Sequence, residues 1–242
     1  EIKSEKLVDY LSNAPDEKLS QAELVLLAVP VKSFKNILPL ILPNISSTAI
    51  LTDTGSVKSP LLKMMYSHDY KKIRFLGGHP IAGSENFGPA AAQNDLFVGK
   101  RCIITPEEKT DKDSIRIVRG FWESMGAKVS EMDPESHDQI FASVSHLPHI
   151  LAYACIHAIS NKDTQEALKH SGAGLKDFSR IASSSPDMWA DIFLENQENL
   201  LPRVLAFKEV LSSLEEKIKK NDKKKLVQLL ALSKEARDRW ML

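Results

Sequence analysis

The sequence predicts an α/β domain followed by an all-α domain. Over residues 1–132, apolar runs of strand length alternate with segments of helical pattern. Asp133 followed by Pro134 is a helix-start signal, with a capping side chain and then a proline in the first turn. Beyond it the pattern is helical, with no convincing strand. We therefore expect domains at 1–132 and 133–242, without repeats or a low-complexity linker.

The expected strands and helices alternate along the first domain. A continuous apolar run such as "AELVLLAVPV" is typical of a strand buried on both faces of a parallel sheet. Further strands are expected in "STAILTD", at the start of "KIRFLGGHPIAG", where the strand runs into glycines, and in "KRCIITP" and "AKVSEMD". Helices are expected in "VKSFKNILPLILP", "VKSPLLKMMYSHDY" and "DSIRIVRGFWESMG". This order predicts a doubly wound parallel sheet.

Composition excludes several classes of function. The 242 residues contain 32 Lys+Arg and 32 Asp+Glu, so no global field favours nucleic acid or an anionic membrane. Neither a membrane-spanning apolar run nor a signal peptide is present in the sequence. Cys102 and Cys155 lie far apart among apolar neighbours, which favours buried free thiols. We expect a cytoplasmic protein that binds neither nucleic acid nor membrane.

The turn Asp53–Ser56 spells Asp-Thr-Gly-Ser, the tetrapeptide of aspartic proteases. Those enzymes are all-β and pair two such motifs, whereas this single copy lies between a strand and a helix, so a protease is excluded. Ligands of open α/β sheets gather at the carboxyl ends of the strands. There Gly55 permits close backbone approach, and Ser56 falls at or beside the first turn of the next helix. A purely structural capping serine is the alternative.

The segment "GGHPIAGSENFG" is expected to follow the third strand at the same edge. His79, between Gly78 and Pro80, is held by restricted backbone with little side-chain crowding nearby, which suits an acid or base better than a core position. Its ordinary pKa near ~6.5 lets it exchange protons around neutrality. Ser84 and Glu85 follow in a loop that could cover a small ligand.

Two further clusters lie in the helical domain. His146 and His149 share one helix face, and Pro148 should kink that helix. No third ligand of a metal site is nearby, so we expect no metal, and packing against the α/β part is the alternative for one of them. Arg180 lies among small residues, as a carboxylate clamp would. Pairing with Asp177 or Asp187 is the competing interpretation.

Five ordered blocks carry a family resemblance. From about residue 22 onward, "DTGSVK", "GGHPIAGSE", "FVGK", "HDQIFASVSHLPHILAYA" and "GLKDFSRIASSSPDMWADIFLEN" together resemble the prephenate/arogenate dehydrogenases of tyrosine biosynthesis. The resemblance implies a Rossmann-type nucleotide-binding domain followed by a helical domain that forms a homodimer. It also implies oxidative decarboxylation of prephenate or arogenate, to 4-hydroxyphenylpyruvate or tyrosine, with hydride transfer to NAD or NADP.

The resemblance also implies a role for each matching residue. His79 would take the proton of the ring hydroxyl, Ser56 would orient His79 beside the nicotinamide, and Arg180 would bind a substrate carboxylate. The remaining members of the implied site are His149 and Ser145 in the substrate pocket, Ser84 and Glu85 at its mouth, and Ala28, Val29, Pro30 and Gly55 beside the cofactor.

One expected part of the family pattern is missing from the sequence. The opening strand, the G-x-G-x-x-G turn and the element that selects NAD or NADP are absent, so we expect an N-terminally incomplete Rossmann-type sheet. A fragment of a longer enzyme is the favoured explanation. The alternative is a catalytically silent dimeric relative that binds the substrate but not the dinucleotide. We expect no C-terminal regulatory domain, and the choice between prephenate and arogenate stays open.

Overall fold

The computed structural model describes residues 8–67, 73–83, 92–160 and 168–241. The predicted sites Ser84 and Glu85 lie outside these residues. The chain divides into two compact units, residues 1–197 and 198–242. The predicted boundary near residue 133 falls inside the first of them and stays a prediction.

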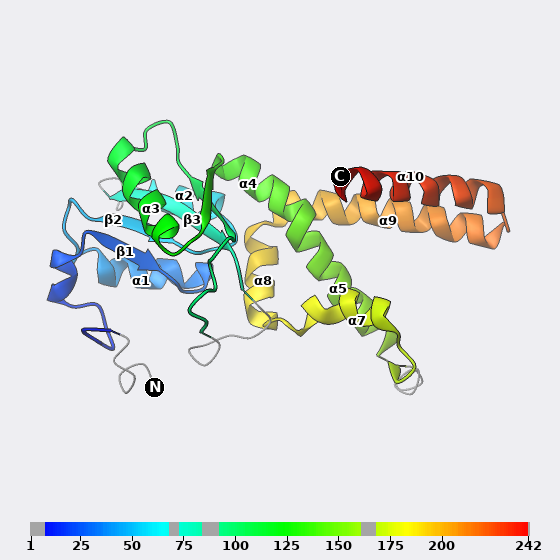
Figure 1. Cartoon of the computed structure of the whole chain (residues 1–242), viewed down its shortest axis with the longest axis horizontal. Coiled ribbons are helices and arrows are strands. Elements are labelled where there is room, and N and C mark those ends of the chain that lie inside the picture. Colours follow the sequence, from blue (N-terminus) through cyan, green and yellow to red (C-terminus); the bar gives the residue numbers. More distant parts are fainter. Residues whose placement is uncertain (1–7, 68–72, 84–91, 161–167, 242) are drawn as a thin grey trace. The chain divides into compact units, whose positions relative to one another are not determined.

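A five-stranded sheet organises the first unit (Figure 1). Its strands are β1 (Leu24–Leu27), β2 (Ile50–Asp53), β3 (Arg74–Ile81), β4 (Arg101–Thr105) and β5 (Lys128–Glu131), in that spatial order. The pairs β1–β2, β2–β3 and β4–β5 are parallel, whereas β3 and β4 are antiparallel. The α/β class is therefore confirmed, but the sheet is mixed rather than wholly parallel. Antiparallel neighbours need no crossover helix between them.

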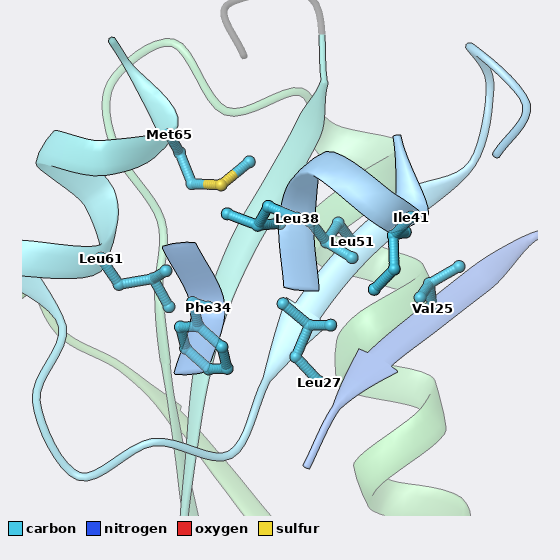
Figure 2. Close-up of a cluster of buried hydrophobic side chains, with 8 residues drawn as sticks. All are labelled: Val25, Leu27, Phe34, Leu38, Ile41, Leu51, Leu61 and Met65. Carbon is cyan, nitrogen blue, oxygen red and sulfur yellow. The ribbon is translucent and has the colours of Figure 1, made fainter. Parts of the chain in front are cut away.

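Alternation along β2 distributes side chains to two hydrophobic clusters. Leu51 belongs to a cluster with residues of β1, of α1 (Phe34–Ile41) and of α2 (Ser59–Met65). Figure 2 shows this cluster, in which Phe34 and Leu38 of α1 are fully buried against strand residues. A short 3₁₀ turn (Val31–Ser33) leads from β1 into α1, and another (Glu17–Gln21) precedes β1.

Ile50, the residue before Leu51 in β2, belongs to the second cluster. There α3 (Lys112–Ser124) places Val118 and Trp122 against Leu76 and the β4 residues Cys102 and Ile104. Neighbouring residues of a strand point to opposite faces, so the sheet is covered on both sides. This two-sided burial explains the continuous apolar runs in the sequence and holds the strand ends in fixed positions.

The helical segment begins where the sequence predicts. Asp133 caps α4 (Pro134–Phe141), and its side chain accepts a hydrogen bond from the Ser136 backbone N–H at 2.8 Å. A π-helical turn (Ala142–His146) then leads into α5 (Leu147–Ile159), where Pro148 occupies the first turn. The expected interruption near Pro148 thus takes the form of a π-helical turn, a feature that is frequent at functional sites.

The helix Pro134–Ile159 is, among the described residues, the one segment long and apolar enough to cross a membrane by length and composition. Its buried His137, Asp138 and His146 are hydrogen-bonded to other parts of the first unit. Only 22% of its apolar window is buried, and a single segment of this kind is weak evidence for a membrane span.

Among the described residues, three further elements belong to the first unit. These are α7 (Ala173–Ser179), a 3₁₀ turn (Arg180–Ser183) and α8 (Pro186–Glu195). Ser184 is extended, and the Ser185 side chain caps α8 by accepting from the Met188 N–H at 3.4 Å. The second unit contains nearly all of α9 (Gln197–Lys219) and the whole of α10 (Lys223–Met241). Asn221, with φ of 50°, lies in the turn that joins these helices.

Two local expectations are wrong. His79 lies inside β3 rather than in a loop after it, because antiparallel pairing with β4 carries the strand through Gly77, Gly78, His79 and Pro80. The pairing overrides the weak strand propensity of glycine and proline. Cys102 is a buried free thiol as expected, but Cys155 is only partly buried.

Candidate active site

The turn after β2 is organised by the carboxylate of Asp53, which is completely buried. One of its oxygens, Oδ2, accepts a hydrogen bond from the Gly55 N–H at 2.7 Å, which closes the turn. The other oxygen, Oδ1, accepts from the Gly78 N–H at 3.0 Å. The Asp of the Asp-Thr-Gly-Ser motif therefore joins the carboxyl end of β2 to the middle of β3.

Lys58 neutralises this buried carboxylate. Its ammonium group forms an ion pair with Asp53 and donates a hydrogen bond to the Gly78 carbonyl at 2.7 Å. Both side chains are almost completely removed from solvent. Removing either partner of such a pair leaves an uncompensated buried charge, which typically costs about 3–5 kcal/mol of stability. The pair therefore fixes the backbone at Gly78, the residue before His79.

His79 itself belongs to a chain of hydrogen bonds. Its Nδ1 lies 2.8 Å from Nε2 of His137, and Nδ1 of His137 lies 2.8 Å from Oδ1 of Asp138. The Phe141 ring is stacked on His137 and tilted against His79, with ring centroids 4.5 and 4.8 Å away. The two imidazoles and the carboxylate are all buried. We call His79, His137 and Asp138 the relay.

Asp138 is anchored by backbone donors. Oδ1 accepts from the Lys58 N–H and Oδ2 from the Ser59 N–H, each at 2.8 Å. The Asn196 amide also donates to the Asp138 carbonyl at 2.8 Å. The start of α2 thus holds the end of the relay that lies farthest from His79.

Burial sets the protonation state of the relay. It lowers the pKa of His79 well below the ordinary value, and the nearby His137, Lys58 and His146 lower it further. Burial likewise lowers the pKa of His137, although Asp138 opposes that shift. For Asp138, burial favours the neutral acid, but hydrogen bonds from His137 and the Lys58 and Ser59 backbone outweigh it and lower the pKa. At neutral pH both imidazoles are neutral and the carboxylate is ionised.

A cleft of about 460 Å³ lies beside this turn. One wall comes from the ends of β1 and β2 and includes Ser56, and the other comes from α8. Its volume is in the range of small-molecule sites. The lining includes every residue predicted from the family resemblance to lie beside the cofactor: Ala28, Val29, Pro30 and Gly55.

Close packing at Gly55 fits a cofactor site. A Cβ atom on this glycine would lie 2.8 Å from both Asp53 Oδ2 and Val31 Cγ2. The absence of a side chain therefore lets the turn fold tightly against the loop after β1, and backbone rather than side chain borders the cleft. The residues present fit the nicotinamide end of a dinucleotide at the carboxyl ends of the strands.

The two histidines of the helical segment have different surroundings. His146 is completely buried, and its Nδ1 lies 3.1 Å from the Asn196 amide. Burial lowers the pKa of His146 to about 4. The packing interpretation thus describes His146. His149 is partly buried and stacks on Trp189, with ring centroids 3.5 Å apart.

His149 lies on α5, which contacts the 3₁₀ turn that begins with Arg180. Burial lowers the pKa of His149, and the positive charge of Arg180 adds to the shift. The Ser145 carbonyl is 2.9 Å from Nδ1 of His149. Trp189, which bears the stacked imidazole, packs against Val57, the residue after Ser56. Arg180 is solvent-exposed, as a group that meets an anionic ligand should be.

Comparison with known protein families decides the relationship. Residues 3–131 match the model described as prephenate dehydrogenase, nucleotide-binding domain, and residues 133–232 match prephenate dehydrogenase, dimerization domain. The chain belongs to the prephenate dehydrogenase family. This membership confirms the predicted family, the class of oxidoreductase and the nicotinamide type of cofactor.

Two curated relatives are identical to this chain at about a third of the aligned positions. Cyclohexadienyl dehydrogenase of Zymomonas mobilis is 33% identical over 96% of this chain and 80% of its own length. Prephenate dehydrogenase of Bacillus subtilis is 32% identical over 91% of this chain, which spans 60% of that relative.

Solved structures of the family show the same fold. Prephenate dehydrogenase from Aquifex aeolicus is 36% identical, with a TM-score of 0.86 over 98% of this chain and 85% of that one. A second structure from A. aeolicus, in complex with hydroxyphenyl propionate and NAD+, is 39% identical, with a TM-score of 0.80 over 90% and 76% of the two chains. Arogenate dehydrogenase from Synechocystis is 30% identical, with a TM-score of 0.75 over 93% and 81%.

In this prephenate dehydrogenase family member, the structure brings most predicted site residues into connected contacts. Ser56 lines the cleft, His149 is joined to it through Trp189, and Arg180 acts on His149 through its charge. His79 is joined to the same turn through the relay. The roles of these residues stay predictions.

Sequence reasoning missed the residues that support His79. His137 and Asp138 stand inside the quoted block "HDQIFASVSHLPHILAYA", and Lys58 ends "DTGSVK". A polar His-Asp pair in the first turns of a buried helix was the available signal. Asn196 and Trp189 stand inside the last quoted block, but neither carried a pattern of its own.

Proposed function

We propose that this chain oxidises and decarboxylates prephenate or arogenate, with His79 as the general base. The observation that carries the proposal is the relay, which holds a neutral, buried imidazole in the domain that carries the cofactor cleft. A neutral imidazole can accept a proton at neutral pH, as the reaction requires.

The reaction removes a hydride and a carboxylate from one ring. The hydroxyl proton of the substrate passes to His79 while the carbon that bears the hydroxyl loses hydride. The C–C bond to the ring carboxylate then breaks, carbon dioxide leaves, and the electron pair of that bond completes the aromatic ring, whose phenolate oxygen takes the proton back from His79. A nicotinamide dinucleotide, when bound, supplies the hydride acceptor. Aromatisation provides much of the driving force, so the protein chiefly has to position the groups.

The other residues bind and orient. We assign Ser56 to the position between His79 and the nicotinamide, since it lines the cleft at the turn that the relay anchors. Arg180 would bind a substrate carboxylate, because guanidinium is a planar double donor for that group. His149, stacked on Trp189, would border the same space with Ser145. Ser84 and Glu85 are proposed for the mouth of the pocket from the family resemblance alone.

The cellular setting and assembly are part of the proposal. A homodimer through the helical domain is supported by the dimerization domain that residues 133–232 match. A reducing compartment such as the cytoplasm is consistent with two free cysteines. NAD and NADP, like prephenate and arogenate, are alternatives that competition assays with the purified protein will distinguish.

Steady-state kinetics of two variants test the assignment. His79→Asn should lower kcat by about 10²–10⁴-fold with little change in the Michaelis constant, because only the base is lost. Arg180→Gln should instead raise the Michaelis constant of the substrate, by about tenfold or more, while kcat changes less. As a matched control, Lys176→Gln removes an exposed cation one helical turn before Arg180 and should leave both constants near wild type.

Preserved turnover in His79→Asn would remove His79 from its role. An unchanged Michaelis constant in Arg180→Gln would favour the structural interpretation of that arginine.

A further inference from the structure

The unusual feature of the site is that His79 hydrogen-bonds to another histidine rather than to a carboxylate. Each neutral imidazole has one N–H donor and one acceptor nitrogen, so two neighbouring histidines can share a hydrogen bond in either direction. The direction decides which nitrogen of His79 carries the lone pair. Only the nitrogen with the lone pair can act as a base.

Asp138 decides the direction. Its carboxylate is ionised at neutral pH and can only accept, and it already accepts from two backbone N–H groups. Nδ1 of His137, 2.8 Å from this carboxylate, must therefore carry a proton. Because burial keeps His137 neutral, its Nε2 has no proton and can only accept.

The constraint then passes to His79. The acceptor Nε2 of His137 lies 2.8 Å from Nδ1 of His79, so Nδ1 of His79 must be the donor. The lone pair of His79 is left on Nε2. We propose that His137 and Asp138 are positioning residues, which fix His79 in the tautomer that presents a basic Nε2 to the substrate.

The relay also suits the state after proton transfer. When Nε2 of His79 takes the substrate proton, Nδ1 still donates to His137, so no hydrogen bond has to reverse during the reaction. Preorganisation of this kind avoids reorganisation in the transition state. The backbone N–H groups of Lys58 and Ser59 hold Asp138 in place. The constraint on the tautomer of His79 therefore begins at the start of α2, just after the turn that contains Ser56.

Other charged and titratable groups face His79 without fixing its tautomer. Lys58, Asp53 and His146 act on the relay histidines electrostatically. The ammonium of Lys58 is committed to Asp53 and the Gly78 carbonyl, and His146 pairs with Asn196. The proposal rests on the proposed function of His79 as base, and its test separates the two.

Three variants of the relay, with steady-state kinetics, provide the first test. His137→Phe keeps a ring beside Phe141 but removes the acceptor for His79, and Asp138→Asn removes the obligatory acceptor for His137. Each should lower kcat by about 10²–10⁴-fold, as expected for a wrong tautomer of His79. The Michaelis constants of the substrate and of the dinucleotide should stay within about threefold of wild type. His137→Gln can donate to Asp138 and accept from His79 through one amide, so it should recover kcat to within about tenfold of wild type.

The pH profile of the reaction provides a second test, because a purely structural role of Asp138 would leave that profile unchanged. In Asp138→Asn, the acid limb of kcat/KM should shift to lower pH, because the carboxylate no longer stabilises the protonated relay. Thermal unfolding shows whether each variant is folded. Where Asp138→Asn or His137→Phe fails to fold, the comparison of His137→Gln with wild type and the spectroscopic test below still decide.

Nitrogen-15 spectra of histidine-labelled wild-type protein measure the tautomer directly, with His79→Asn identifying the signals of His79. A proton on Nδ1 and none on Nε2 supports the relay, and the opposite tautomer overturns it even in a protein without turnover. Near-wild-type kcat in both His137→Phe and Asp138→Asn, with His79→Asn inactive, would also overturn the relay while leaving the proposed function intact. A wild-type protein inactive with both prephenate and arogenate would instead contradict the function.

Discussion

At the scale of the residue, the site depends on two glycines at which a side chain would have no room. Gly78 lies beside β2 so closely that a Cβ would be 2.8 Å from the Asp53 carbonyl oxygen. Gly55 has a similar restriction on the other side of Asp53. The sequence shows these glycines, but the reason for Gly78 is a contact between strands that are more than twenty residues apart, and the reason for Gly55 includes Val31 in the turn after β1.

Gly55→Ala should therefore impair the cofactor cleft. The added methyl group meets Asp53 and Val31 at 2.8 Å, so the turn must move where it borders the cleft. We expect the dissociation constant of the dinucleotide to rise by about tenfold, together with a loss of stability of about 1–3 kcal/mol from overpacking. Calorimetric titration and denaturant unfolding measure the two effects.

Gly120→Ala is the matched control. Gly120 is exposed in the middle of α3 with open space around its Cα, so alanine should stabilise the protein by up to about 1 kcal/mol without affecting binding. Equal dinucleotide binding by both variants would show that the tight turn does not shape the cleft.

At the scale of the element, α9 presents a stripe of exposed apolar side chains. Phe207, Leu211 and Ile218 recur at helical spacing, and Leu211 and Ile218 are more than half exposed. Large exposed apolar patches mark interaction surfaces. The stripe falls within the matched dimerization domain, which supports a second copy of the chain as its partner.

Leu211→Glu should weaken the proposed dimer. A charge in the middle of the stripe would be buried unpaired on association, which is unfavourable by several kcal/mol. We expect the dimer dissociation constant to rise by at least about tenfold, as measured by sedimentation. Ser212→Glu, one residue further along and also exposed, should leave it near wild type. A chain that is monomeric before mutation, or equal dissociation constants, would contradict the assignment.

At the scale of the whole molecule, the site makes stability depend on pH. Burial lowers the pKa values of His79, His137, His146 and His149. A histidine with a lowered folded-state pKa binds fewer protons in the native than in the unfolded chain, so stability falls as pH drops below the unfolded value of about 6.5. The burial that keeps the base neutral therefore also makes the fold sensitive to acid.

His146 allows this coupling to be measured. With a pKa of about 4 in the folded chain, it should contribute a loss of about 2 kcal/mol between pH 7 and pH 5. His146→Asn cannot titrate, so the fall in its unfolding free energy over that range should be smaller than in wild type. His157→Asn, at an exposed position on α5, should keep the wild-type dependence. Identical slopes for wild type and His146→Asn would exclude this source of acid sensitivity.

The sequence allowed most of the architecture to be predicted because the signals involved are local. Strand runs, the Asp133 cap with Pro134, and the glycine-containing turn after β2 depend on neighbours within a few residues. The cofactor-side residues followed from the family motifs and do line one cleft. The course of β3 through His79 could not be predicted, since it depends on pairing with β4 about twenty residues later.

What the sequence determined by itself was the succession of elements, the family and the candidate base, all of which are written in short contiguous motifs. Only the tertiary structure decided that His79 is buried in a strand and supported by His137 and Asp138, residues 58 and 59 positions away along the chain. The physical reason is that a tautomer depends on donors and acceptors in space. Their directions are settled only when α4 packs against the start of α2 and the middle of β3.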